Sequence, residues 1–163
     1  MAKQAVNVQE AMFGAGCFWG VEKILGHVPG VLETQVGYAG GTVPHPDYDA
    51  VCTGKTGHAE VVHLKYDATK VSYTQLLEVF WKYHDPTTRN RQGPDIGSQY
   101  RSIIFTYTPE QDKLARASIR VLDRAKVYPG PIVTEVVPSA PFYVAEDYHQ
   151  KYLQKNPNGY CSH

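Results

Sequence analysis

The sequence has 163 residues, of which 42% are hydrophobic, with three cysteines, equal numbers of acidic and basic residues and a pI near 7.0. This length suits one domain that buries a core without disulfides or metals. The neutral charge argues against nucleic-acid or membrane-surface binding, because both need a basic patch. No apolar run approaches the roughly 20 residues that span a bilayer, and the first ten residues do not resemble a signal peptide. We expect a cytoplasmic monomer whose cysteines pair only transiently, in catalysis.

The first part of the chain predicts a strand, a helix and a second strand. Residues 10–16 read as a short buried strand, and residues 19–28 have the apolar spacing of an amphipathic helix. Residues 31–38 alternate between apolar and polar side chains, as a half-buried strand does. The apolar side of this strand consists of Leu32, Thr34, Val36 and Tyr38. A long loop over residues 39–57 has room for one helical turn.

The order of strand, helix and strand then recurs. Residues 58–67 alternate again, and residues 72–85 form a helix that opens with a Ser-x-x-Gln capping box. A polar loop leads to a strand over residues 101–107, and a further helix runs to about residue 127. The first six elements follow the order β-α-β-β-α-β, which is typical of ferredoxin-like domains. We therefore predict an α+β fold.

A smaller C-terminal part completes the predicted domain. We expect a strand near residues 132–137, a short helix near residues 145–153 and an irregular tail. The whole chain, 1–163, is then a single domain. Its core covers about residues 8–137, and its C-terminal helix and mobile tail cover about residues 138–163.

The predicted strand order brings distant residues to one edge of the sheet. In this topology the first strand lies between the third and the fourth and runs antiparallel to both, while the second flanks the third. The end of strand one, the loop after strand two, the start of strand three and the approach to strand four then share an edge. These positions hold Cys17, Tyr48, Glu60, Asp95, Ser98 and Tyr100. We expect Cys17 and Glu60 to lie within about two side-chain lengths of each other.

Cys17 lies in GAGCFWG, where the first predicted strand becomes a helix. A thiol reacts as its thiolate, and the N–H groups and dipole at a helix N-terminus favour that anion. Cysteines are also commonly small buried hydrophobes, and Phe18 and Trp19 would then be ordinary core residues. This stretch by itself supports both interpretations equally.

Glu60 shares one side of its predicted strand with Val62, Leu64 and Tyr66. Burial on that apolar side would raise the pKa of its carboxyl and make it a candidate general acid near neutral pH. The alternative is that Glu60, near the start of the strand, reaches water. Before its neighbours are considered, both interpretations stand.

The other two cysteines have different prospects. Cys161 lies in NGYCSH at the end of the chain, where it can condense with an oxidised Cys17 or remain an idle tail residue. For Cys52 we predict a packed, structural role, although a second resolving thiol there stays open.

Other sites have weak support. The seven histidines lack metal-ligand spacing and no Cys-x-x-Cys pair occurs, so no metal is expected. GKTG is not a P-loop, because it lacks the first glycine at the required distance. His149 offers a Cys17–His149 acyl transferase or hydrolase as an alternative enzyme. A binding module with a redox-sensitive switch is an alternative of another class.

Four motifs together resemble those of the A-class peptide methionine sulfoxide reductases. They are GCFWG at 16–20, GHAE at 57–60, DIGSQYRS at 95–102 and GYC at 159–161. The resemblance extends from about Glu10 to Cys161. It implies reduction of the S epimer of methionine sulfoxide, free and in oxidised proteins. It also implies no bound cofactor, with thioredoxin or dithiothreitol as the external reductant.

Carried over position by position, the resemblance implies that Cys17 attacks the sulfoxide sulfur and that Glu60 protonates the oxygen. Cys161 then resolves the sulfenic acid as a disulfide, which thioredoxin attacks directly because the tail holds no further cysteine. The residues implied to assist are Tyr48 and Tyr100 at the sulfoxide oxygen, Phe18 and Trp19 around the S-methyl group, and Asp95 in the lining of the site.

Overall fold

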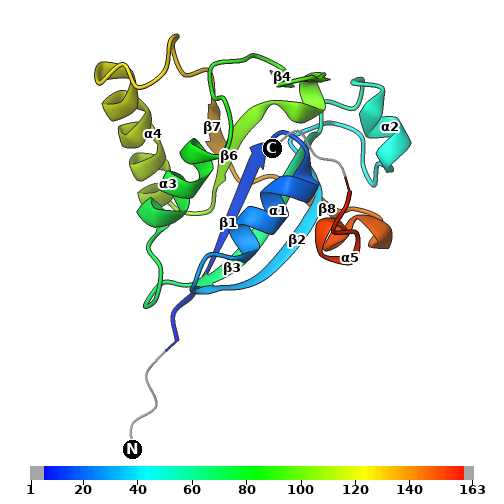
Figure 1. Cartoon of the computed structure of the whole chain (residues 1–163), viewed down its shortest axis with the longest axis horizontal. Coiled ribbons are helices and arrows are strands. Elements are labelled where there is room, and N and C mark those ends of the chain that lie inside the picture. Colours follow the sequence, from blue (N-terminus) through cyan, green and yellow to red (C-terminus); the bar gives the residue numbers. More distant parts are fainter. Residues whose placement is uncertain (1–5, 160–163) are drawn as a thin grey trace, which may run out of the picture.

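A computed structural model describes residues 6–159, and it has helices packed against one face of a mixed sheet (Figure 1). The elements in chain order are β1 (Val8–Ala15), α1 (Phe18–Gly26), β2 (Val31–Ala39), α2 (Tyr48–Cys52), β3 (Ala59–Asp67), α3 (Tyr73–Lys82), β4 (Arg91–Gln92), β5 (Asp95–Ile96), the 3₁₀ helix η1 (Ser98–Tyr100), β6 (Ser102–Thr106), α4 (Pro109–Arg124), β7 (Glu135–Pro138), β8 (Phe142–Val144), the 3₁₀ helix η2 (Asp147–His149) and α5 (Tyr152–Lys155). The α+β class is as predicted.

The main sheet has six strands in the order β7-β6-β1-β3-β2-β8. β1 runs antiparallel to both β3 and β6, and β2 runs antiparallel to β3. These are the pairings expected for the first four predicted strands. β7 extends the sheet in parallel beside β6, and β8 extends it in antiparallel fashion beside β2. The shared edge at the end of β1 and the start of β3 therefore exists.

The helices cover one face of this sheet. In Figure 1 α1 lies in front of the strands and α3 and α4 lie to the left of β1, and the apolar sides of these helices bury the larger core cluster. Inward residues of this cluster include Phe13, Leu25 and Leu76, which are 0–2% exposed. A smaller cluster around Met12 and Phe105 fills the other face. Together they hold the sheet, and the edge that it forms, in a fixed position.

Local signals explain where the two long helices begin. At α3 the Ser72 hydroxyl accepts from the Gln75 amide, and the Gln75 side chain accepts from the Ser72 amide, as a capping box does. At α4 the Thr108 side chain accepts from the Gln111 amide and proline occupies the first turn. The start of α3 at Ser72 agrees with the sequence prediction.

The C-terminal part differs from the prediction. The expected helix over 145–153 is wrong: this segment holds η2 and α5, separated by Lys151 in the left-handed region with φ 56°. β8, just before it, was not expected. The predicted polar loop before β6 contains the two-stranded ribbon of β4 and β5. Leu32 is 52% exposed rather than inward-facing, because a bulge between Val31 and Glu33 breaks the alternation.

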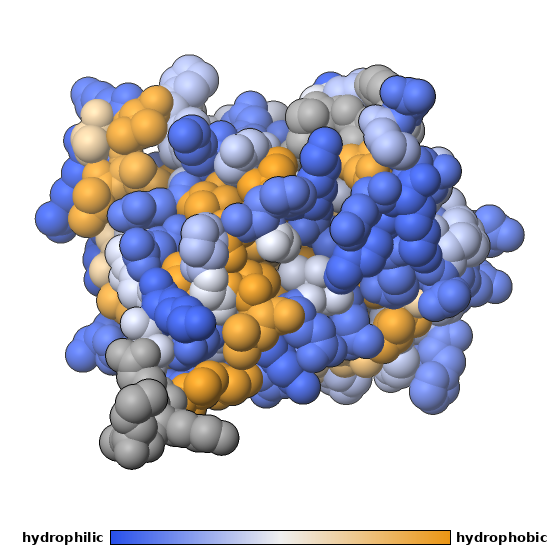
Figure 2. Space-filling view, turned by 60° about the horizontal axis from the view of Figure 1, so that its bottom comes forward, coloured by the Kyte–Doolittle hydropathy of each residue, from blue (hydrophilic) through white to orange (hydrophobic). Residues whose placement is uncertain are grey.

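The surface interleaves apolar and polar side chains on the face shown in Figure 2. Exposed large apolar residues include Val6, Val8 and Leu32. Among the described residues, no helix is both long and apolar enough to cross a bilayer.

Candidate active site

The turn between β1 and α1 places Cys17 at the N-cap of the helix. Gly16 makes this turn with φ 95°, a conformation that favours glycine. Cys17 is half-buried, and its carbonyl accepts from the Val21 amide at 3.4 Å. The N–H groups of the first turn and the helix dipole favour a negative charge at such a position. The backbone therefore favours a thiolate at Cys17.

Glu60 lies directly beside this turn. The Phe18 amide donates to Oε1 of Glu60 at 3.2 Å, so the residue after Cys17 contacts the carboxyl. Glu60 is 2% exposed and shares its side of β3 with Val62 and Leu64, which are fully buried. Glu60 therefore lies close to the turn that bears Cys17, as expected. The alternative, in which Glu60 reaches water near the start of the strand, is wrong, because its side chain is buried.

Two tyrosines come to the same edge from separate elements. Tyr48 opens α2 and Tyr100 ends η1, and both are half-buried. Burial raises the pKa of each hydroxyl well above the usual range, and at Tyr48 the interaction with the Cys52 thiol raises the pKa further. Both phenols therefore stay protonated at neutral pH and can donate hydrogen bonds.

Asp95 belongs to the same group of residues. It is half-buried in β5, opposite Gln92 in the β4–β5 ribbon. Its charge contributes to the raised pKa of Tyr100, after burial, Glu60 and Cys52. Ser98 donates to the Gly54 carbonyl at 3.4 Å and so links η1 to the loop after α2. Tyr48, Tyr100 and Asp95 therefore lie at the same sheet edge as Cys17 and Glu60.

Phe18 and Trp19 have different environments. Phe18 is 1% exposed, and its ring lies 5.8 Å from the Tyr38 ring and 5.1 Å from the His149 ring. Trp19 is half-buried and stacks on Tyr152 with ring centroids 3.7 Å apart. Its indole N–H donates to Nδ1 of His149 at 2.9 Å. Phe18 is therefore a buried residue beneath the sheet edge, and Trp19 is a partly exposed residue whose ring is fixed by Tyr152 and His149.

His149 does not have the geometry of a catalytic base for Cys17. An indole N–H can only donate, so Nδ1 of His149 must accept and Nε2 must carry the proton. Nε2 is buried and has no hydrogen-bond partner among residues 6–159. Burial also lowers the pKa of His149, although the Glu146 charge opposes that shift. Because neither nitrogen offers a lone pair, the arrangement argues against a Cys17–His149 hydrolase.

Glu146 is a residue of the site that the sequence analysis missed. Its carboxylate accepts from the Tyr38 hydroxyl and from the Tyr48 amide, both at 2.9 Å. Burial alone would raise the pKa of Glu146, but hydrogen bonds from the Tyr48 amide, from its own backbone amide and from the Tyr38 hydroxyl together help to lower the pKa below its usual value. Glu146 thus fixes the start of α2, which bears Tyr48. The sequence offers only one weak signal for Glu146, its position in the polar run EDYHQ. Its partners could not be inferred, because they lie about 100 residues away.

The other two cysteines, Cys52 and Cys161, have different environments. Cys52 is exposed rather than packed, and its thiol is hydrogen-bonded to the Tyr48 hydroxyl. Partial desolvation raises the pKa of Cys52, and the bond to Tyr48 opposes this shift. Cys161 lies outside the described residues. Gly159, the last described residue, packs so closely on Tyr152 that a Cβ there would come within 2.9 Å of the ring.

A groove of about 510 Å³ lies beside α1 but away from these groups. It is bounded by α1, the start of β2 and the C-terminal segment, and Trp19 is the one residue it shares with the predicted site. No cysteine among residues 6–159 lines this groove, whereas Cys17 and Glu60 lie together at the sheet edge. Within residues 6–159, no cluster of three or more His, Cys, Asp or Glu could hold a metal ion.

The fold and the site define a thiol-based enzyme class: a cysteine at a helix N-terminus, a buried carboxyl and two phenols converge on one sheet edge. The model of the family "Peptide methionine sulfoxide reductase" matches residues 9–163. The MsrA of Methanoculleus marisnigri is 57% identical over 95% of this chain and 94% of its own. The MsrA of Geobacter sulfurreducens is 53% identical over 95% and 96%. The chain belongs to the peptide methionine sulfoxide reductase family.

Solved structures are similar too. Methionine sulfoxide reductase A of Corynebacterium diphtheriae has a TM-score of 0.85 and 42% identity over 96% of this chain and 78% of its own. Reduced Mxr1 from Saccharomyces cerevisiae has a TM-score of 0.86 and 36% identity over 94% and 88%. Mxr1 in complex with Trx2 matches with a TM-score of 0.60 and 24% identity over 89% and 84%, which supports the fold alone.

Proposed function

We propose that this protein reduces methionine sulfoxide to methionine with Cys17 as the nucleophile. The observation that carries the proposal is the contact between the Phe18 amide and Glu60, which sets a buried acid beside the helix terminus that bears the thiol. A sulfoxide oxygen leaves poorly unless it is protonated, so the reaction needs a thiolate and an acid together. Membership of the family supports the same activity.

The first step joins Cys17 to the substrate. The thiolate attacks the sulfoxide sulfur while Glu60 gives a proton to the oxygen. Because Oε1 of Glu60 accepts from the Phe18 amide, we assign the transferable proton to Oε2. A charged Glu60 would disfavour the thiolate, and a protonated carboxyl in an apolar setting removes that conflict. The S–O bond of the substrate and the new bond between the two sulfurs then break as an S–O bond to Cys17 forms, so methionine leaves reduced and Cys17 is oxidised by two electrons to its sulfenic acid.

The remaining edge residues orient the substrate. Tyr48 and Tyr100 keep their protons and would donate to the strongly accepting sulfoxide oxygen. The rings of Phe18 and Trp19 suit a methyl group and a polarisable sulfur. We assign to Asp95 a role in holding the substrate or an ordered water in the same site.

Cys161 would resolve the sulfenic acid of Cys17 as a disulfide, with loss of water. Gly159 packs on the Tyr152 ring, and Tyr152 stacks on Trp19 of α1. Only these two aromatic side chains therefore separate Gly159 from α1. An extended chain covers about 3.6 Å per residue, and Cys161 is only two residues further on. A thioredoxin would then reduce the disulfide. The structure of Mxr1 has been solved in complex with Trx2. The identity between Mxr1 in that complex and this chain is 24%, so the match supports only the fold.

The wider assignments remain part of the proposal. Substrates are the S epimer of methionine sulfoxide, free and in oxidised proteins, and no metal or organic cofactor takes part. The neutral charge argues against a nucleic-acid or membrane partner, we take a monomer as the default state, and cysteines that pair only transiently suit the cytoplasm. We take residues 1–163 as one catalytic domain. The strand order β6-β1-β3-β2 supports a ferredoxin-like core for it.

The test is methionine release from methionine (S)-sulfoxide with dithiothreitol. We expect turnover by the wild type, none by Cys17→Ser, and little change in Cys52→Ser, a matched cysteine variant outside the reaction. The R epimer should not be reduced. No release by the wild type, or equal release by Cys17→Ser, would overturn the proposal. A hydrolase would show a thioester and no need for reductant, and a binding module would show no turnover.

A further inference from the structure

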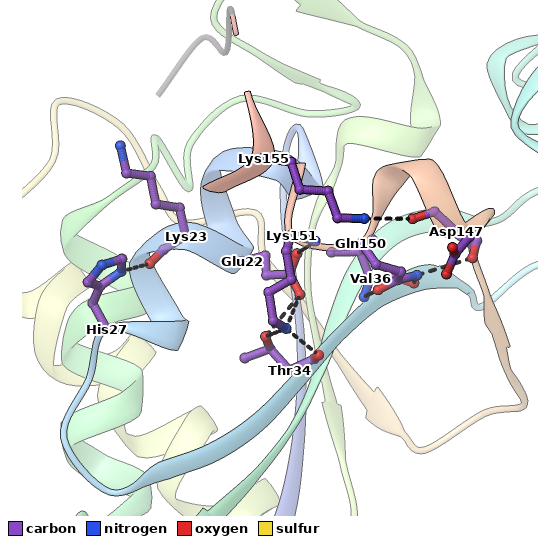
Figure 3. A network of polar contacts seen from close by, with 10 residues as sticks. Glu22, Lys23, His27, Thr34, Val36, Asp147, Gln150, Lys151 and Lys155 are labelled. Carbon is purple, nitrogen blue, oxygen red and sulfur yellow. Dashed lines mark hydrogen bonds and ion pairs between the residues drawn. The ribbon is translucent and has the colours of Figure 1, made fainter. Parts of the chain in front are cut away.

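Glu22 is a buried acid that takes no part in the proposed chemistry. It lies in α1, one turn after Trp19, and is 3% exposed. Both of its oxygens are occupied: Oε1 accepts from the Lys151 amide at 2.7 Å, and Oε2 accepts from Thr34 Oγ1 at 2.9 Å and Lys151 Nζ at 3.1 Å. Figure 3 shows this network between α1, β2 and the C-terminal segment. A buried carboxylate so fully paired is held in one position.

Lys151 is the residue at which the C-terminal segment turns. Its φ of 56° separates η2 from α5 and is an unusual conformation for a residue other than glycine. Its Nζ also donates to the Thr34 carbonyl at 2.9 Å and to Thr34 Oγ1 at 2.7 Å. Next to it, the Gln150 side chain accepts from the Val36 amide and donates to the Val36 carbonyl, both at 2.9 Å. The turn is therefore fixed from α1 and from β2 at once.

The two residues that hold Trp19 lie on either side of this turn. His149, two residues before Lys151, accepts from the indole N–H, and Tyr152, the next residue after it, stacks on the indole. Gly159 then packs on Tyr152. A change in the direction of the chain at Lys151 would move both supports of Trp19 and the start of the tail.

We infer that Glu22 is a positioning residue that acts through Lys151. By fixing Lys151 it sets the position of Trp19, and the position of Trp19 in turn sets the affinity for the sulfoxide. Glu22 also sets the position of Gly159, after which the segment with Cys161 follows. This inference rests on the proposed function for its kinetic meaning. Glu22 touches none of the reacting groups, so the rate of the chemical step at saturating sulfoxide should depend little on it. The concentration of sulfoxide needed for saturation, and the rate at which the disulfide then forms, should depend on it strongly.

The alternative is that the network only stabilises the fold. Only the Glu22 side of this ion pair is buried, since the Lys151 side chain is 45% exposed. Desolvation of the carboxylate offsets much of the attraction, whereas removal of one partner leaves a buried group without its charged partner. A purely stabilising role predicts a lower unfolding temperature with unchanged kinetics of the folded fraction. The two roles are separated by kinetics measured on folded protein.

The experiment uses Glu22→Gln, which keeps the shape but turns one acceptor into a donor that faces Lys151 and Thr34. Leu122→Ala in α4, a partly buried residue away from the C-terminal segment, serves as the control with reduced stability. Single-turnover methionine release is measured against sulfoxide concentration, followed by the rate of thiol loss. For Glu22→Gln we expect half-saturation to rise about three- to tenfold, as loss of an aromatic contact does. The saturating rate should stay within about twofold, and disulfide formation should slow.

Two further measurements keep the inference open to refutation. Lys151→Arg retains the positive charge and should restore part of the affinity that Lys151→Met loses; Lys151→Met also serves if Glu22→Gln fails to fold. Quenching of Trp19 fluorescence by iodide, in a Trp81→Phe background, should increase in Glu22→Gln. Kinetics and quenching like those of Leu122→Ala would overturn the inference. No methionine release by the wild type would instead overturn the proposed function, while unchanged quenching would still refute the positioning by Glu22.

Discussion

The Phe18 amide donates a hydrogen bond to Oε1 of Glu60 at 3.2 Å. These residues lie 42 positions apart, one in the first turn of α1 and the other in β3. The bond fixes a buried carboxyl against the helix terminus that bears Cys17. The orientation of that carboxyl, rather than its mere presence, decides which of its oxygens can serve as an acid.

Replacing Glu60 by glutamine tests its role as the acid. The amide oxygen of the glutamine side chain can still accept from the Phe18 amide, so the fold should persist, but an amide is a far weaker proton donor. We expect the single-turnover rate of methionine release to fall by about 10²–10⁴-fold, the usual contribution of general acid catalysis. A rate within about twofold of the wild type would leave Glu60 with a structural role only.

Removing the Tyr48 hydroxyl should affect both catalysis and the neighbouring thiol. In Tyr48→Phe we expect a loss of about tenfold or more in rate, because a hydrogen bond to a strongly accepting oxygen disappears. The same change should raise the pKa of Cys52, since the Tyr48 hydroxyl opposes the shift that desolvation causes. The pH dependence of Cys52 alkylation measures this. A pKa of Cys52 that falls or stays constant would contradict the contact.

Acid should weaken the support of Trp19 by His149. Burial lowers the pKa of His149 below its usual 6.5, so the folded state resists protonation while the unfolded state takes the proton. The stability due to neutral His149 is therefore complete above about pH 6.5 and is lost as pH falls through the lowered pKa. Urea unfolding at pH 7 and pH 5 should show a smaller pH effect in His149→Gln than in the wild type. An equal pH effect in the two proteins would refute this.

Glu146→Gln should loosen the start of α2. Its carboxylate serves two donors, the Tyr38 hydroxyl and the Tyr48 amide. The amide that replaces it has one acceptor oxygen, so one buried donor loses its partner at a cost of about 1–3 kcal/mol. We expect a lower free energy of unfolding together with a reduced rate of methionine release, because Tyr48 shifts. Glu33→Gln, on the exposed start of β2, is the matched control and should change neither value.

The parts of the fold that depend on local signals could be predicted from the sequence. The capping box at Ser72 marks the start of α3, and the alternation in β3 places Glu60 on the buried side. The turn at Lys151 could not, because its left-handed conformation depends on Glu22 and Thr34, which lie more than 110 residues earlier. Local periodicity contains no trace of such partners.

The site divides in the same way. Cys17 could be selected as a candidate from its place at a strand-to-helix turn, and Glu60 from its parity within a strand, but each pattern by itself was equally compatible with a structural role. Glu146 and Tyr152 act only through partners in the first third of the chain, Tyr48 and Trp19. Because these partners lie in distant segments, the local pattern of residues 145–153 is that of an ordinary helix.

The most direct test of the reaction through Cys17 is a single turnover of Cys161→Ser with methionine (S)-sulfoxide in the absence of reductant, followed by dimedone labelling and peptide mapping. We predict about one methionine released per enzyme and dimedone attached to Cys17, because the sulfenic acid then lacks its resolving thiol. Release of methionine with the label on Cys52, or with Cys17 left as an unmodified thiol, would contradict the mechanism.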